Sequence, residues 1–157
     1  MPTRPTVTDN QWFQVSLKLL LQNEAGETLI LKCPDDSSLA GFYDLPGGRI
    51  AATEKELPFA EIIKREVTEE LGSAVNYELE STKPIAIGRH HYPSKKMQQE
   101  VYLFWVLFGA QYQSGAINLS NEHQSYQWVK LTAANLEQYF IRGPLDLMNN
   151  YQLNRKP

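Results

Sequence analysis

The segment at residues 58–71 constrains the fold most, because its apolar residues recur with the period of an α-helix. At about 100° per residue, one side of this helix gathers Phe59, Ile62, Ile63, Val67 and Leu71. The other side carries Glu61, Lys64, Arg65 and Thr68. Pro58 suits the first turn, where its missing N–H is not needed. We therefore expect an amphipathic helix whose apolar side faces a core.

Three glutamates of this helix stand where stability alone would not place them. Glu66 and Glu70 fall inside the apolar stripe, and Glu69 lies at its edge. A buried carboxylate costs on the order of several kcal/mol unless it is compensated, and the last helical turn disfavours anions by roughly 0.3–1 kcal/mol each. A hard divalent cation bound through oxygen removes these penalties together. Paired glutamates on a helix usually form a solvated acidic face. Here their position in the apolar stripe favours a metal site instead.

The segment at residues 47–72 also resembles a known motif, the Nudix box, with the pattern G-x5-E-x7-R-E-U-x-E-E-x-G-U in which U is apolar. Gly48 and Glu54 match its first half, and LPGG just before it is typical of Nudix proteins. The second half is matched by Arg65, Glu66, Val67, Glu69, Glu70 and Gly72. The chain departs from the pattern at Ser73, which should be apolar, and in three extra residues before Arg65. We expect these residues in a loop ahead of the helix, and either Glu54 or Glu56 can then be the first box glutamate.

The resemblance implies a fold, an activity and a set of ligands. The fold class is α/β, a Nudix-type α/β/α sandwich with a mixed β-sheet between helices, and residues 1–157 are expected to form a single Nudix domain. The activity is that of a Nudix pyrophosphohydrolase, acting on an acid anhydride in a nucleoside diphosphate linked to another moiety. Mg²⁺ or Mn²⁺ would be the cofactor, held by Glu66, Glu69, Glu70 and the carbonyl of Gly47. Arg65 would orient a glutamate through a salt bridge, and Glu69 and Arg65 are both counted as catalytic.

A further acid is needed near the attacking water, as a base or as another ligand. Glu122 is the candidate, because it lies in the loop SNEHQSYQW, and many Nudix proteins place a functional glutamate shortly before a strand that contains a tryptophan, here Trp128. A plain loop acid is an equal alternative. Glu100 is a rival that we expect to cap or pair at the start of a strand. His123 is expected to be a solvated histidine.

The sequence says little about the substrate. Phe42 and Tyr43 could stack on a base. His90, His91 and Tyr92, together with Lys95 and Lys96, could line a phosphate or base pocket. Core packing for Phe42 and Tyr43, and an ordinary polar hairpin for the other five residues, remain open. No further motif separates nucleoside triphosphates from nucleotide sugars, dinucleoside polyphosphates or capped RNA, so the expected partner is a small nucleotide-type molecule.

Composition narrows the setting. A chain of 157 residues suits one domain with one core. Its net charge of −3 and the lack of a basic block give no nucleic-acid surface. The single cysteine, Cys33, lies in an apolar strand and is expected in the core. We find no secretory signal and no apolar run long enough for a bilayer, so no membrane contact and a cytoplasmic location are expected. A homodimer stays open as the oligomeric state.

The remaining hydrophobic patterns predict the other elements of the sandwich. Residues 92–99 are expected to form a basic, polar loop, and the two glycines that open the segment at residues 47–72 are expected to form a turn. Thr132 is expected to cap a helix at residues 133–139, and Pro144 to open a last helix that ends near Tyr151. Strands are expected at residues 13–21, 28–32, 42–45, 76–79, 85–89, 101–108 and 126–129.

Two classes of function stay open at this stage. The first is the metal-dependent pyrophosphohydrolase, which the complete REVTEE sequence favours. The second is a catalytically silent Nudix-like module that binds or senses a nucleotide, which the longer loop and Ser73 keep open. Phosphate release from a nucleotide panel, with and without a chelator, separates the two.

Overall fold

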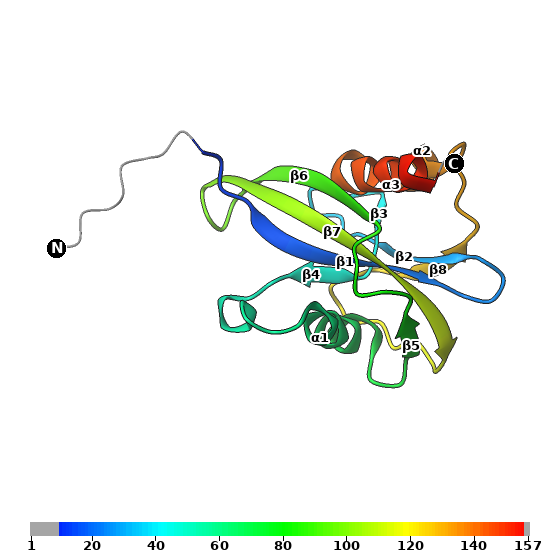
Figure 1. Ribbon diagram of the computed structural model, residues 1–157. Coiled ribbons are helices and arrows are strands. Elements are labelled where there is room, and N and C mark those ends of the chain that lie inside the picture. Colours follow the sequence, from blue (N-terminus) through cyan, green and yellow to red (C-terminus); the bar gives the residue numbers. More distant parts are fainter. Residues whose placement is uncertain (1–9, 156–157) are drawn as a thin grey trace.

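Two helical layers enclose a mixed β-sheet in this protein (Figure 1). The computed structural model describes residues 10–155. Helix α1 (Phe59–Leu71) lies on one side of the sheet, and helices α2 (Leu136–Tyr139) and α3 (Arg142–Arg155) lie on the other. The predicted α/β/α sandwich is therefore confirmed. Among the helices of the described residues, none is long and apolar enough to cross a membrane.

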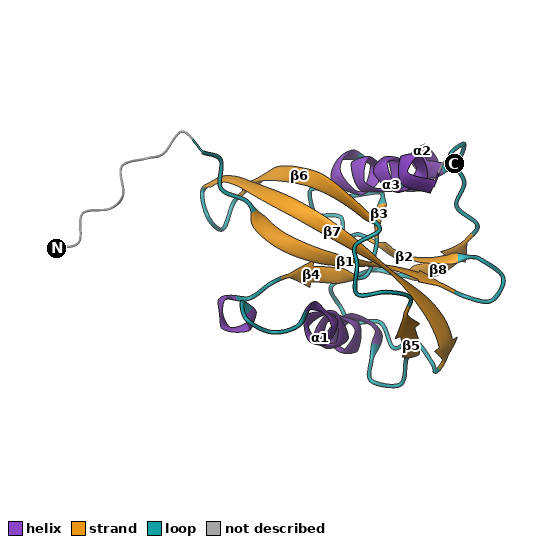
Figure 2. Ribbon diagram, viewed as in Figure 1, coloured by secondary structure: helices purple, strands orange, loops and turns teal. Residues whose placement is uncertain are grey.

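The sheet is built around two long neighbouring strands (Figure 2). Its main order is β3-β2-β1-β7-β5, with β4 paired to β1, β6 to β7 and β8 to β2. The β1–β7 pair is parallel and the others are antiparallel, which makes the sheet mixed. The strands are β1 (Gln14–Gln22), β2 (Thr28–Lys32), β3 (Tyr43–Asp44), β4 (Gly47–Arg49), β5 (Asn76–Leu79), β6 (Ala86–Ser94), β7 (Gln99–Ser114) and β8 (Tyr126–Val129).

Strand β1 is central because its apolar run can be buried on both faces, as the near-continuous hydrophobic strands of covered sheets are. Leu17, Leu19 and Leu21 belong to the core under α1. Leu20 belongs to the opposite core, under α2 and α3. Since side chains alternate along a strand, Lys18 also faces away from α1. The buried Cys33 joins that second core, as expected.

The hairpin of β6 and β7 differs from the prediction. Residues 92–99 were expected to form a loop, but β6 continues to Ser94 and β7 begins at Gln99. Pairing reaches Ser94 opposite Gln99, which leaves only residues 95–98 for the turn. Polar residues fit this strand because buried and exposed side chains alternate as far as His91, and none of residues 92–94 is fully buried.

The glycine pair before α1 also differs, since it lies in a strand rather than a turn. Gly47 and Gly48 belong to β4, opposite Lys18 and Leu17 of β1. Gly47 has a φ of 133°, and a Cβ there would overlap the carbonyl of Leu17. Only glycine permits this close approach of two strands.

The last two helices have other bounds than the sequence predicted. Helix α2 spans only Leu136–Tyr139, and Asn135 stands at its N-cap instead of Thr132. The backbone N–H of Thr132 donates to the Asn135 side chain at 2.8 Å, which ties the preceding turn closed. Helix α3 begins at Arg142, ahead of the predicted Pro144, and continues past Tyr151 to Arg155.

Candidate active site

The three extra residues lie ahead of α1 and do not change which residues of the helix face the sheet. Residues Ala52–Glu54 form a short 3₁₀ turn, and α1 then starts after Pro58, which is its N-cap. The Glu54 carboxylate accepts bonds from the Arg65 guanidinium and, at 3.0 Å, from the backbone N–H of Ala51. Glu56 is exposed. Of the two candidates for the first box glutamate, Glu54 is therefore the one that meets Arg65.

Arg65 holds three glutamates at once. Besides Glu54, its Nη1 lies 2.7 Å from Glu66 Oε1 and 3.0 Å from Glu69 Oε2. The bonds from Arg65 lower the pKa of Glu54, and the same bonds raise the pKa of Arg65. This arrangement fits the predicted role of Arg65 as a residue that orients a carboxylate.

Two glutamates of α1 are buried, as the helical pattern predicted. Glu66 is 8% exposed and Glu70 is 3% exposed, whereas the Glu69 side chain is 57% exposed at the edge of the stripe. Burial raises the pKa of Glu70 to about 8. It also raises the pKa of Glu66, against the opposing effect of Arg65. Both carboxylates are thus destabilised in their charged form unless a cation reaches them.

The glycines of β4 bring the backbone against these carboxylates. The N–H of Gly47 donates to Glu70 Oε2 at 2.8 Å. A Cβ on Gly48 would overlap the carboxylate of Glu66. The glycine pair is therefore needed for the sheet and the acidic side of α1 to touch, and it puts Gly47, the predicted carbonyl ligand, next to Glu70.

The donor set suits a hard cation, although it is engaged with the protein. Within residues 10–155, no three His, Cys, Asp or Glu side chains converge closely enough to hold a metal ion. Arg65 occupies Glu66 and Glu69, and Glu70 accepts the Gly47 N–H. Carboxylate oxygens are nevertheless the ligands that Mg²⁺ and Mn²⁺ prefer.

The loop before β8 brings a different residue to the site than the sequence favoured. Glu122 is exposed, with its backbone N–H bonded to Ser120. His123 was expected to be solvated, and that is wrong: its side chain is only 10% exposed, and Nδ1 lies 3.9 Å from Glu70 Oε1. This nitrogen has no hydrogen-bond partner in the described part of the chain. Glu100 lies on β7 and pairs with His91 at 3.4 Å, outside the site.

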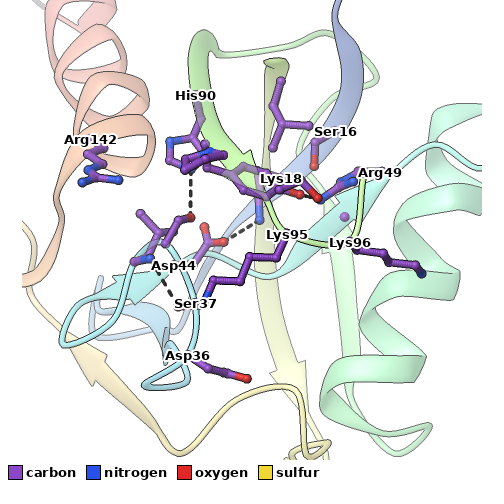
Figure 3. Close-up of a pocket in the computed structure, with 17 residues that line it drawn as sticks. Ser16, Lys18, Asp36, Ser37, Asp44, Arg49, His90, Lys95, Lys96 and Arg142 are labelled. Atoms are coloured by element: carbon purple, nitrogen blue, oxygen red, sulfur yellow. Dashed lines mark hydrogen bonds and ion pairs between the residues drawn. The ribbon is translucent and has the colours of Figure 1, made fainter. Parts of the chain in front are cut away.

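A cleft of about 810 Å³ opens beside the glycine pair (Figure 3). Its wall includes Lys18 of β1, whose Nζ lies 2.8 Å from Asp44 Oδ2 and 4.8 Å from the centre of the Trp105 ring. Burial alone would lower the pKa of Lys18, but the charges of Asp44 and Glu70 outweigh it and raise the pKa. Gly48 also lines the cleft, and Glu66 lies against Gly48, so this glycine stands between the cleft and the buried Glu66.

The residues considered for the substrate are divided by the fold. His90, Tyr92, Lys95 and Lys96 line the cleft. Tyr43 packs on Tyr139 and accepts a hydrogen bond from Gln127, and His91 pairs with Glu100; neither is part of the cleft wall. The wall also contains residues that the sequence analysis did not single out for this role, notably Lys18 and Arg142. A lysine inside the apolar run LKLLL was a visible signal for the first of them.

Comparison with known proteins identifies the class of this site. A family model described as NUDIX domain matches residues 12–147, which is most of the chain. No match was found among curated proteins. The chain belongs to the NUDIX domain family. By class it is a Nudix pyrophosphohydrolase, as the resemblance implied.

Solved structures of other Nudix-related proteins share this fold. The MutT protein from Methanosarcina mazei Go1 is 26% identical, with a TM-score of 0.60, over 90% of this chain and 89% of that one. The NUDIX domain of Shewanella oneidensis NrtR, complexed with ADP ribose, is 13% identical, with a TM-score of 0.61, over 93% and 88%. A bifunctional NMN adenylyltransferase/ADP ribose pyrophosphatase from Francisella tularensis, complexed with AMP and Mn ion, is 19% identical, with a TM-score of 0.52, over 93% and 41%.

Proposed function

We propose that this protein hydrolyses the pyrophosphate bond of a nucleoside diphosphate linked to another moiety, and that it requires Mg²⁺ or Mn²⁺. One observation carries the proposal: two buried carboxylates lie against the glycine pair of β4, and one glycine of that pair, Gly48, also lines the cleft. Glu66 meets Gly48, and Glu70 bonds Gly47. A substrate in the cleft would therefore have its pyrophosphate beside the acidic side of α1.

The chain's own groups divide the work. Glu66, Glu69, Glu70 and the Gly47 carbonyl would hold the cation, which supplies charge neutralisation at the phosphate oxygens and the leaving group. Arg65, anchored by Glu54, would position the glutamates. The bifunctional Francisella tularensis protein, which shares this fold over 41% of its length, was solved with a Mn ion, and this supports a divalent cation as the cofactor.

The cleft is suited to the rest of a nucleotide. It has the size of small-molecule sites, which are commonly about 300–1,000 Å³, and Lys18, Arg49, Lys95, Lys96 and Arg142 give it several cations. The ADP ribose bound by the Shewanella oneidensis domain supports a nucleotide derivative as the substrate class.

Glu122 is the proposed base or further ligand near the attacking water. If so, Glu122→Gln should lower kcat much more than it raises KM, since its contact would form with the attacking water. The same change at Glu100 should have little effect. A larger loss of kcat in the Glu100 variant would move the catalytic acid to the start of β7.

The experiment that tests the function measures cleavage of a panel of pyrophosphate compounds, by chromatography of the phosphorylated products. The panel contains nucleoside triphosphates, ADP ribose, nucleotide sugars and a dinucleoside polyphosphate, each with Mg²⁺, with Mn²⁺ and with a chelator. We expect turnover of at least one compound that the chelator stops and added metal restores. Turnover that persists in the chelator, or binding of nucleotides without any turnover, would contradict the proposal.

A further inference from the structure

The cleft continues beyond the site of the proposed reaction. A second cavity of about 580 Å³ adjoins it, and both are lined by His90, Pro93 and Arg142. Arg142 therefore stands at the junction of the two cavities. Figure 3 shows its side chain at the start of the last helix, on the other side of the cleft from α1.

The backbone at this junction is held in an unusual conformation. Arg142 has a φ of 52°, a left-handed conformation that non-glycine residues rarely adopt. The next residue, Gly143, packs so closely on His90 that a Cβ would overlap the imidazole. The start of α3 therefore packs closely against β6. The left-handed backbone at Arg142, although it costs conformational free energy, places an arginine at the junction of the two cavities. Residues in such conformations gather at functional sites.

The Arg142 guanidinium is free to bind a ligand. In the part of the chain that the structure describes, Arg142, Lys95 and Lys96 form no ion pair with an acid. Two acids line the cleft, Asp36 and Asp44, and Lys18 neutralises the second of them. The cleft therefore has an excess of positive charge.

The acids of the second cavity are also engaged. Glu100 pairs with His91, and Asp146 accepts the backbone N–H of Arg89 at 3.0 Å. His90, which lines both cavities, is neutral because burial lowers its pKa to about 4, and its Nε2 lies 3.3 Å from the Ser38 hydroxyl. Among residues 10–155, neither Glu100 nor Asp146 forms an ion pair with Arg142, so its guanidinium is left for a ligand.

We propose that Arg142 is a specificity-determining residue, which binds a second anionic group of the substrate, remote from the pyrophosphate that is cleaved. This inference rests on the proposed function. The planar guanidinium, with its fork of N–H donors, matches a phosphate or a carboxylate. The preferred substrate is then a nucleoside diphosphate whose attached moiety, or whose nucleoside, carries one more negative group.

Matched substrate pairs test the proposal and distinguish the two anions. UDP-glucuronic acid differs from UDP-glucose by a carboxylate, and NADPH differs from NADH by a phosphate. We expect kcat/KM to favour the anionic member of at least one pair by about tenfold or more, as for a hydrogen-bonded charge. Arg142→Asn should abolish this preference, mainly by raising the KM of the anionic member. Asparagine is the replacement because it tolerates the left-handed backbone. Arg142→Lys should keep part of it.

Controls keep the test decisive. Arg155→Asn makes the same change of charge at the other end of α3, outside the cleft, and should leave the preference intact. Calorimetric binding of the same pairs to each variant gives a second measurement that does not depend on turnover. If no pair is hydrolysed but the anionic members bind more tightly through Arg142, the proposed function is at fault and the inference stands. Equal kcat/KM and equal affinity for both members of each pair, or a preference that survives Arg142→Asn, would overturn the inference.

Discussion

Helices α1 and α3 pack on opposite faces of the same sheet, yet they bury different kinds of side chain. Helix α3 buries Gly143, Pro144, Leu147 and Met148. Helix α1 buries Ile62, Ile63, Glu66, Val67, Glu70 and Leu71. Both sets are large enough to anchor a helix, so the two carboxylates are not needed for packing. Burying the two carboxylates lowers the stability of the fold, and α3 buries no charged side chain.

The difference separates stability from chemistry within one fold. Helix α3 keeps its charged residues exposed, and Arg142 reaches the cleft only from the helix start. Helix α1 places ionisable groups where water cannot solvate them, and functional sites commonly accept such a loss of stability. The comparison predicts that changes on α1 alter activity, and that changes on the buried side of α3 alter the free energy of unfolding.

The largest expected effect is on α1. Glu70→Gln should lower turnover by about a hundredfold or more, the scale on which a disturbed metal ligand acts. The fold should survive, because an unfavourable buried charge is removed. Steady-state rates and a thermal melt measure both. Glu61→Gln, an exposed residue of the same helix, is the control, and normal activity in the Glu70 variant would refute its assignment as a ligand.

The corresponding change on α3 should affect only stability. Leu147→Ala should cost about 2–5 kcal/mol in the free energy of unfolding, since it leaves a cavity in the core. Denaturant titration measures this. The exposed Leu153→Ala on the same helix should stay within about 0.5 kcal/mol of the wild type. A loss of kcat in the folded Leu147 variant as large as that of Glu70→Gln would break the comparison.

The buried charge on α1 should also be visible in the pH dependence of stability. The pKa of Glu70 rises from 4.5 to about 8 on folding, so the native state favours the protonated carboxyl. Without metal, this group should therefore lower stability as pH rises from about 4.5 to 8. The free energy of unfolding of Glu70→Gln should exceed that of the wild type by on the order of a few kcal/mol at pH 8, and the two should be equal near pH 4. An equal difference at both pH values would contradict the burial effect.

The smallest expected effect comes from the extra residues ahead of α1. Deleting residues 55–57, which are exposed, should keep metal-dependent activity within about tenfold, because the Glu54–Arg65 pair and the α1 register need none of them. Glu54→Gln should cost more activity than this deletion, and Glu56→Gln should cost less than Glu54→Gln. Loss of activity in a folded deletion variant, with Glu54 still present, would show that the loop itself is part of the site.

The sequence alone determined α1 and its acids, because helical geometry is local. Spacing put Glu66 and Glu70 in the apolar stripe and Glu69 at its edge, and the structure agrees. The alternation of strands and helices was also readable, down to the bounds of β2 and β8. The local pattern failed at residues 92–94, which are at most partly buried, since pairing with β7 decides their conformation.

Only the tertiary structure decided what surrounds the acids. His90 faces the cleft and His91 faces away because β6 continues in register with β7, a choice that no local pattern makes. Arg142 reaches the same cleft from more than fifty residues further along the chain, because Gly143 lets α3 pack against His90. His123 is largely covered beside Glu70 because its loop folds back over the end of α1, where the backbone N–H of Ser120 donates to the Glu70 carbonyl at 2.9 Å. Side chains far apart in sequence meet through strand register and close backbone approach, and these are properties of the packed chain.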